Sequence, residues 1–268
     1  MNIQDTRKCN LMNLAMVERY FGVESSVLIN FYEEICADTS FLTDVNDQID
    51  NARRNWAFEK GIFGKGQVSS VDWFAFERIL IYVLIRHFRP KVVLETGVYY
   101  GGNSAFALAA LSKNKYGHMV SIDYPDSEIR KSKVPESRHA LVGDSELYSS
   151  DLSPGFMVPV ALHDRWELME GDSLAIIPGL KYSIDFYIHD SDHSMQFLLS
   201  EIAAAWKKLT ASAVLLIDDI DWSNAFYAFC VDQRLHPLLV TDNGKDDLRV
   251  RTGLAKRDHP RNFDNSFT

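Results

Sequence analysis

The chain has 268 residues, enough for one α/β domain with an added segment or for two small domains. Its net charge of −9 and isoelectric point of about 5.4 argue against a broad phosphate-binding surface for DNA or RNA. The longest apolar run, at residues 79–85, is far shorter than the roughly 20 residues that span a bilayer, and the N-terminus has no apolar signal core. The cysteines, Cys9, Cys36 and Cys230, suit neither a disulfide framework nor a zinc site. We therefore expect a cytoplasmic protein that binds neither nucleic acid nor a membrane.

Residues 1–70 are expected to form a helical N-terminal cap. Apolar residues recur at helical spacing in the segments 11–20 and 27–36, with acidic residues between them. Such a cap can cover the sheet or form a contact in a homo-oligomer, or it can wall a substrate pocket. The sequence leaves both roles open.

Residues 71–257 alternate between expected strands and expected helices. The first helix is expected to begin after Ser69 and Ser70, which can cap it, and to stop before Pro90. The expected strands are residues 92–94, 118–122, 166–170, 184–189 and 213–217, followed by a closing pair at 238–241 and 249–254 with a turn at 242–244. Such alternation predicts a parallel sheet with helices on both faces.

Two segments are expected to lie outside this regular pattern. The segment 124–165 contains four prolines, and an insertion of this length is usually a lid, a binding loop or disordered. Residues 258–268 are polar and are expected to form a loose tail.

The stretch from Lys91 to Ser104 combines a short strand, a glycine-bearing turn and the start of a helix, which is how nucleotide sites are built in open parallel sheets. Glycine lets the backbone come close to a ligand. A dinucleotide fingerprint requires a second glycine two places after Gly97, where this chain has Tyr99. The tyrosine would crowd a pyrophosphate, so a nicotinamide cofactor is disfavoured, although it stays an alternative.

Acidic residues follow four of the expected strands. They are Glu95, Asp123, Asp190 and the pair Asp218–Asp219. Because ligands of such sheets bind beyond the carboxyl ends of the strands, we expect these side chains to converge on one crevice. Asp123 could accept both ribose hydroxyls of a nucleoside or simply cap the next turn. Asp172 and Ser173 follow the third strand, where an adenine edge would lie, although a plain turn is the alternative.

The acids after the fourth and fifth strands predict a metal site. Adjacent strands lie about 4.8 Å apart, so Asp190, Asp218 and Asp219 can meet around one ion. Carboxylates without cysteine select a hard cation, Mg²⁺ first. His193, three residues after Asp190, could take a proton from a hydroxyl, whereas His189 should face away as a core histidine. Alternatively, Asp190 contacts only the cofactor, while the acidic pair caps a helix.

The order and spacing of these motifs resemble a bacterial group of class I S-adenosylmethionine-dependent methyltransferases, methyltransferase family 24. The motifs are ETGVYYGGNS, SIDYP, GFMVPVALHDRWELMEGDS, IDFYIHDSDHSM, EIAAAW and LLIDDI, and the resemblance runs from about Ser69 to Lys256. It implies a Rossmann-like, mostly parallel seven-stranded sheet. It also implies cofactor contacts at Glu95, Gly97, Ser104, Asp123, Asp172 and Ser173.

Metal-dependent relatives in this group include macrolide sugar O-methyltransferases of the macrocin type. In those enzymes, acids at the positions of Asp190 and Asp218–Asp219 hold Mg²⁺, and a histidine at the position of His193 is the base. The pair here is Asp-Asp, where the macrocin type has Glu-Asp. The resemblance thus implies Mg²⁺-assisted methylation of a hydroxyl on a small molecule, such as a sugar or natural-product intermediate, with Asp190 and His193 as catalytic residues. A metal-independent methyltransferase, a nicotinamide-dependent oxidoreductase and a non-catalytic cofactor-binding module remain alternatives.

Overall fold

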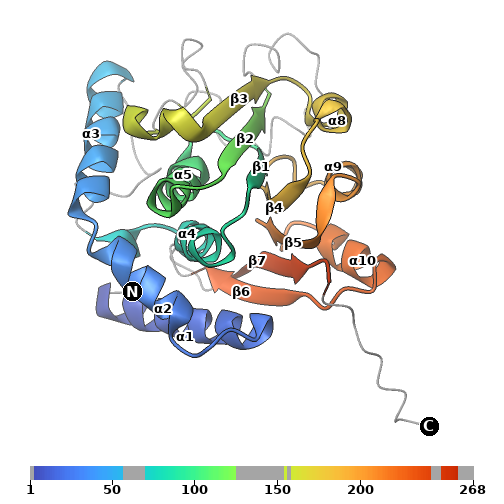
Figure 1. Ribbon diagram of the computed structural model, residues 1–268, viewed down its shortest axis with the longest axis horizontal. Helices are drawn as coiled ribbons and strands as arrows, with labels where there is room; N and C mark the ends of the chain where they lie inside the picture. Colours follow the sequence, from blue (N-terminus) through green and yellow to red (C-terminus); the bar gives the residue numbers. More distant parts are fainter. Residues whose placement is uncertain (1–2, 57–69, 125–153, 156–157, 243–248, 259–268) are drawn as a thin grey trace.

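The computed structural model describes residues 3–56, 70–124, 154–155, 158–242 and 249–258 (Figure 1). Most of the expected insertion, all but the first residue of the turn expected at 242–244, and the tail beyond residue 258 lie outside these ranges. Within them, a twisted sheet is flanked by helices on both faces, with further helices from the N-terminal segment along one side. No described helix has the length and apolar character needed to cross a membrane.

Seven strands form one sheet in the order β3-β2-β1-β4-β5-β7-β6. They are β1 (Val92–Thr96), β2 (His118–Asp123), β3 (Trp166–Glu170), β4 (Ile184–His189), β5 (Leu209–Ile217), β6 (Leu238–Asp242) and β7 (Arg249–Lys256). Strand β7 runs opposite to the other six, so its pairings with β5 and β6 are antiparallel and the remaining pairings are parallel. The predicted mostly parallel sheet is confirmed. Strand β5 begins earlier than expected because its pairing with β4 shifts register after Leu209 and resumes at Val214.

The two faces of the sheet are covered by different helices. They are α4 (Phe76–Phe88) and α5 (Gly102–Asn114) on one face, and α9 (Met195–Trp206), α10 (Ala225–Asp232) and the short α8 (Ser173–Ile176) on the other. Side chains alternate along each strand, so Val93 packs with the α4 and α5 cluster, whereas Leu94 packs with the α9 and α10 cluster. Strand β1 is buried along its whole length, as expected for the centre of a parallel sheet.

Helix α4 begins later than expected. The Ser70 hydroxyl accepts a hydrogen bond from the Asp72 backbone N–H and caps a short 3₁₀ turn at Val71–Trp73. Phe74 then takes an extended conformation, and α4 starts at Phe76. The serine cap was thus correctly placed but belongs to a separate turn. As a result Glu77 lies in the first turn of the long helix.

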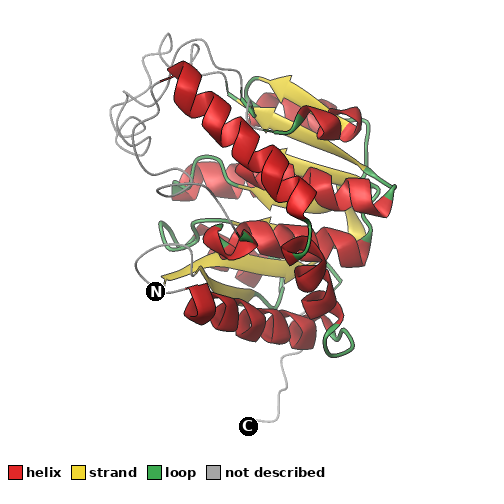
Figure 2. Ribbon diagram, turned by 90° about the vertical axis from the view of Figure 1, so that its left-hand side faces the viewer, coloured by secondary structure: helices red, strands yellow, loops and turns green. Residues whose placement is uncertain are grey.

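Three N-terminal helices pack on the side of α4, α5 and β6 (Figure 2). They are α1 (Ile3–Phe21), α2 (Val27–Cys36) and α3 (Thr39–Trp56). The Asn13 amide of α1 donates to the carbonyl of Thr241 in β6 at 2.9 Å. The carboxylate of Glu34 in α2 accepts hydrogen bonds from Tyr82 and Arg86 of α4. These helices therefore share the core with α4 and α5.

Candidate active site

The turn after β1 is built around a glycine that cannot be replaced without displacing the backbone. Gly97 has φ +81°, and a Cβ added there would lie 2.0 Å from the carbonyl oxygen of Asp190. The backbone N–H of Asp190 donates to the Thr96 carbonyl at 2.8 Å. The sequence predicted close approach to a ligand, but the close neighbour seen here is the end of β4. The turn and Asp190 are thus in direct contact.

Asp123 and Glu95 hold this turn and the helix that follows it. The Asp123 carboxylate accepts hydrogen bonds from the backbone N–H groups of Val98 at 2.9 Å and Tyr99 at 2.6 Å. Glu95 is fully buried, and its Oε2 accepts hydrogen bonds from the hydroxyls of Ser104 and Ser121. Burial outweighs these bonds and raises the pKa of Glu95 to about 7.

Within the described chain, Oε1 of Glu95 has no hydrogen-bond partner. The predicted residues Glu95 and Ser104 therefore meet, and a buried acceptor next to the turn is left open. Ser121 was not predicted. It lies directly opposite Glu95 in the register of β1 and β2, which the sequence does not reveal.

Asp172 and Ser173 follow β3 as predicted, but both are engaged by the protein. The Asp172 side chain accepts a hydrogen bond from the Leu174 backbone N–H at 2.9 Å and caps α8. The Ser173 hydroxyl donates to Oε1 of Glu201. Glu201 is a buried acid of α9 that the sequence reading missed, and its only signal is an acidic residue within an otherwise apolar helix.

His189 is buried and pairs with Glu201, as expected for a core histidine, but it does not face away from the site, because its ring centroid lies 5.7 Å from that of His193. Its side chain is fully buried, and its Nδ1 lies 2.6 Å from Oε2 of Glu201. Burial alone would raise the pKa of Glu201, but the charge of His189 and the hydrogen bonds to this carboxylate lower it to about 2. Glu201 is therefore a buried anion at neutral pH.

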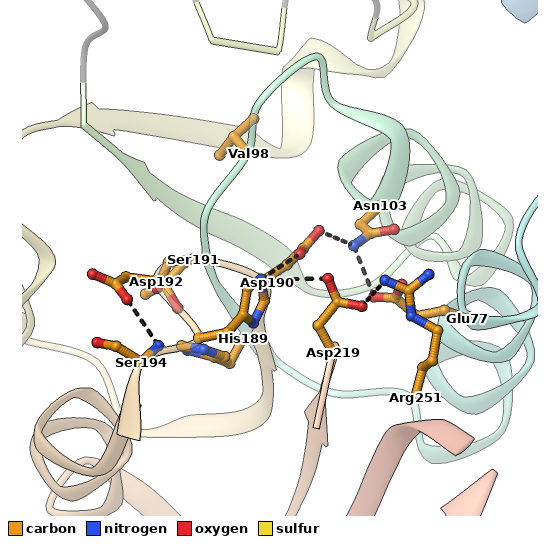
Figure 3. A network of polar contacts seen from close by, with 12 residues as sticks. Glu77, Val98, Asn103, His189, Asp190, Ser191, Asp192, Ser194, Asp219 and Arg251 are labelled. Carbon is orange, nitrogen blue, oxygen red and sulfur yellow. Dashed lines mark hydrogen bonds and ion pairs between the residues drawn. The ribbon is translucent and has the colours of Figure 1, made fainter. Parts of the chain in front are cut away.

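Three carboxylates converge where α4 begins and β4 and β5 end. Glu77, Asp190 and Asp218 each place one oxygen within 4.8 Å of the others. The Asn103 amide nitrogen donates to Glu77 at 2.9 Å and to Asp190 at 3.0 Å (Figure 3). The structure thus unites two of the three predicted metal ligands with Glu77, which precedes β1 and was not predicted.

Asp219 lies beside this cluster but pairs with a residue of β7. It has φ +48°, and its carboxylate pairs with the Arg251 guanidinium (Figure 3). With this left-handed backbone, the carboxylate of Asp219 is directed to a different partner from that of Asp218. Asp218 and Asp219 therefore have different partners although they are adjacent in sequence.

The acid cluster disfavours its own ionisation. Burial, followed by the charges of the neighbouring aspartates, raises the pKa of Asp190 and of Glu77 well above the usual range. Burial and Asp219 raise the pKa of Asp218 to about 6. Like charges this close require a proton or a cation between them. Oxygen ligands and no thiolate are the donor set that Mg²⁺ prefers.

His193 lies beside the cluster at the start of α9. Its Nε2 is 3.8 Å from Oδ1 of Asp190 and 3.7 Å from Oδ2 of Asp219. Burial, followed by the charge of His189, lowers the pKa of His193 to about 4, so the imidazole is neutral at pH 7. The predicted base and the predicted acids are therefore close together, with the imidazole in the form that can accept a proton.

Part of the chain also matches the model of a known protein family. Residues 94–220, from β1 to just beyond β5, match the model of methyltransferase family 24, described as a methyltransferase domain. The match covers slightly less than half of the chain and indicates a methyltransferase domain. The match includes the turn at Gly97, Asp190, His193 and both members of the acidic pair. Among the curated proteins, none matches the chain.

Solved structures confirm the class I fold of this methyltransferase. The O-methyltransferase TomG of Streptomyces achromogenes, solved with S-adenosylmethionine, is 17% identical, with a TM-score of 0.52 over 86% of this chain and 95% of that one. An O-methyltransferase of Bacillus cereus, solved with S-adenosylhomocysteine, is 18% identical, with a TM-score of 0.52 over 86% of this chain and 97% of that one. Because the sequence identity to both structures is below 20%, the structural similarity establishes the fold alone.

Proposed function

We propose that this methyltransferase transfers a methyl group from S-adenosylmethionine to a hydroxyl of a small molecule. One observation carries the proposal. The turn at Gly97, which would face the methyl donor, touches the backbone of Asp190, which belongs to the acid cluster next to His193. A donor site and a proton-accepting site are thus contiguous. The two O-methyltransferase structures, with S-adenosylmethionine and S-adenosylhomocysteine, support the choice of donor.

The residues around the turn fit a nucleoside donor without phosphate. The open Oε1 of Glu95 is a buried acceptor beside the turn, and Asp123 places a second carboxylate at the adjacent strand end. Tyr99 occupies the position where a dinucleotide turn requires glycine. S-adenosylmethionine supplies a methyl group already activated on a sulfonium, so the chain must only align the acceptor and remove its proton.

His193 is the residue that we propose takes this proton. The neutral imidazole can accept it at Nε2, and the carboxylates of Asp190 and Asp219 would stabilise the imidazolium that forms. Such proton transfer typically contributes about 10²- to 10⁴-fold in rate.

We further propose that Mg²⁺ assists the reaction and is held by Glu77, Asp190 and Asp218. Their oxygens are close enough to share one ion, whereas Asp219 is paired with Arg251. The Asn103 amide lies against the same carboxylates, and its Oδ1 has no partner among the described residues. An exchange of the amide oxygen and nitrogen would turn a fourth oxygen toward the acids, which only a cation would favour. A bound Mg²⁺ would supply positive charge beside the acceptor hydroxyl.

The direct test is calorimetric titration of the purified protein with S-adenosylhomocysteine and, separately, with NAD⁺, each with Mg²⁺ and with EDTA. We expect S-adenosylhomocysteine to bind and NAD⁺ not to bind. Binding of NAD⁺ alone, or of neither compound, would refute the proposed donor. A Mg²⁺ heat that is absent in Asp218→Asn would support the metal site, whereas methyl transfer unaffected by EDTA would make the enzyme metal-independent.

A further inference from the structure

Glu201 is buried at the centre of the polar contacts behind the crevice. Its side chain is fully buried on the inner face of α9, among Leu198, Ile202 and Ala205. A buried carboxylate is tolerated only when it is paired and hydrogen-bonded, because its desolvation is costly. Five donors satisfy it: Thr96 Oγ1 at 2.8 Å, Tyr187 OH at 3.1 Å, His189 Nδ1 at 2.6 Å, Ser191 Oγ at 2.8 Å and Ser173 Oγ.

Four of these donors lie at or just beyond the ends of three different strands. Thr96 immediately precedes Gly97 of the cofactor turn. Ser191 and His189 flank Asp190 of the acid cluster. Ser173 follows Asp172 at the end of β3, where the adenine edge is expected. One carboxylate therefore connects the ends of β1, β3 and β4.

We infer that Glu201 is a positioning residue, which holds the cofactor turn, the loop after β3 and Asp190 in the one arrangement that binds the methyl donor and the cation. This inference rests on the proposed function. Four hydrogen bonds of Glu201 go to the chain neighbours of Gly97, Asp190 and Asp172, so it acts through these partners.

The negative charge at this position matters more than the shape of the side chain. Both oxygens of a carboxylate accept hydrogen bonds, and Oε2 here serves four donors. A glutamine has the same size, but its NH₂ group would face hydroxyls or His189 and leave several of them without an acceptor. Loss of such a supporting partner typically costs about 10- to 100-fold in affinity or activity.

The alternative is that Glu201 only stabilises the fold. Glu34 provides a matched control, because its carboxylate also accepts hydrogen bonds from several donors, Tyr82 and Arg86, but at the interface of α2 and α4. Glu34→Gln should lower the melting temperature and leave ligand affinity unchanged. Thr96→Val and Ser191→Ala each remove one donor and keep the buried charge.

The experiment measures the dissociation constants of S-adenosylhomocysteine and Mn²⁺ by calorimetry at a temperature where circular dichroism shows every variant folded. We expect Glu201→Gln to weaken S-adenosylhomocysteine about 10- to 100-fold and to weaken Mn²⁺ as well. Affinities within twofold of the wild type would overturn the inference. If Glu201→Gln does not fold, the same dissociation constants are measured for the Thr96→Val/Ser191→Ala double variant. Unchanged affinities for S-adenosylhomocysteine and Mn²⁺ in that variant would overturn the inference. A wild-type protein that fails to bind S-adenosylhomocysteine would instead refute the proposed function.

Discussion

At the residue scale, the structure separates two neighbouring acids that the sequence groups together. Asp218 joins Glu77 and Asp190, whereas Asp219 turns to Arg251 of β7. An aspartate that is already paired with a guanidinium has less charge to offer a cation, because the cation would have to compete with Arg251. The acid from α4 therefore replaces the second member of the pair in the proposed metal site.

This assignment predicts opposite behaviour for two conservative variants. Glu77→Gln should weaken Mn²⁺ binding about tenfold or more, because it removes one of three charged ligands. Asp219→Asn should change the Mn²⁺ affinity less than about threefold, since that carboxylate is already paired with Arg251. Electron paramagnetic resonance of free Mn²⁺ measures both affinities. If Asp219→Asn weakened Mn²⁺ binding more than Glu77→Gln, Asp219 rather than Glu77 would be the metal ligand, as the sequence predicted.

The raised pKa of Asp218 predicts that, without a bound cation, the ionised carboxylate lowers the free energy of unfolding. Its pKa is about 6 in the folded chain, against an ordinary value of 3.8. The stabilising contribution of the protonated form is therefore complete below 3.8 and is lost as the pH rises through 6. In EDTA at pH 8, Asp218→Asn should stabilise the protein by about 1 to 3 kcal/mol, seen as a higher melting temperature.

This gain in stability should shrink as the pH falls toward 4. Asp219→Asn serves as the comparison and should lower the melting temperature, because it leaves Arg251 without its carboxylate. A melting temperature for Asp218→Asn below that of the wild type at pH 8 would contradict the electrostatic argument.

At the element scale, the position of the crevice follows from how the strands end. The turn after β1 passes so close to the end of β4 that Gly97 leaves no room for a side chain. The turn after β1 and the end of β4 are therefore packed directly against each other at Asp190.

Gly97→Ala should be severely destabilising for this reason. The added Cβ meets the Asp190 carbonyl, and φ +81° disfavours any side chain, so we expect a loss of about 2 kcal/mol or more in the free energy of unfolding. Gly179→Ala is the control, since no described atom beyond its chain neighbours lies within 4 Å of its Cβ position, and it should change stability by less than about 0.5 kcal/mol. Urea denaturation measures both. Equal stabilities for the two variants would show that the turn can relax.

The elements themselves were largely predictable from sequence. Buried strands such as β1 and β4 appear as apolar runs that end in an acid, and this pattern also predicted Asp190 and Asp218 in the crevice. The start of α4 was not predictable, because Ser70 caps a 3₁₀ turn instead of the long helix. Glu77 and Glu201 were missed for a physical reason: each lies on a helix, and only the packing of that helix brings its carboxylate to the strand ends.

At the scale of the whole molecule, the methyltransferase domain and the N-terminal helices share one core. Helices α1–α3 pack on α4, α5 and β6, so they support the helix that carries Glu77. The net charge of −9 suits a cationic sulfonium donor, whose approach a negatively charged molecule assists. The family match, residues 94–220, omits α4 and therefore omits one of the three proposed metal ligands.

The central claim is that donor and cation occupy one crevice, and nuclear magnetic resonance tests it directly. The protein is loaded with S-adenosylmethionine carrying a ¹³C-labelled methyl group, and the methyl signal is followed as Mn²⁺ is added. We predict that Mn²⁺ strongly increases relaxation of the bound methyl signal in the wild type and much less in Asp218→Asn, because Gly97 and Asp190 are in contact. A bound methyl signal that Mn²⁺ leaves unchanged would contradict the account.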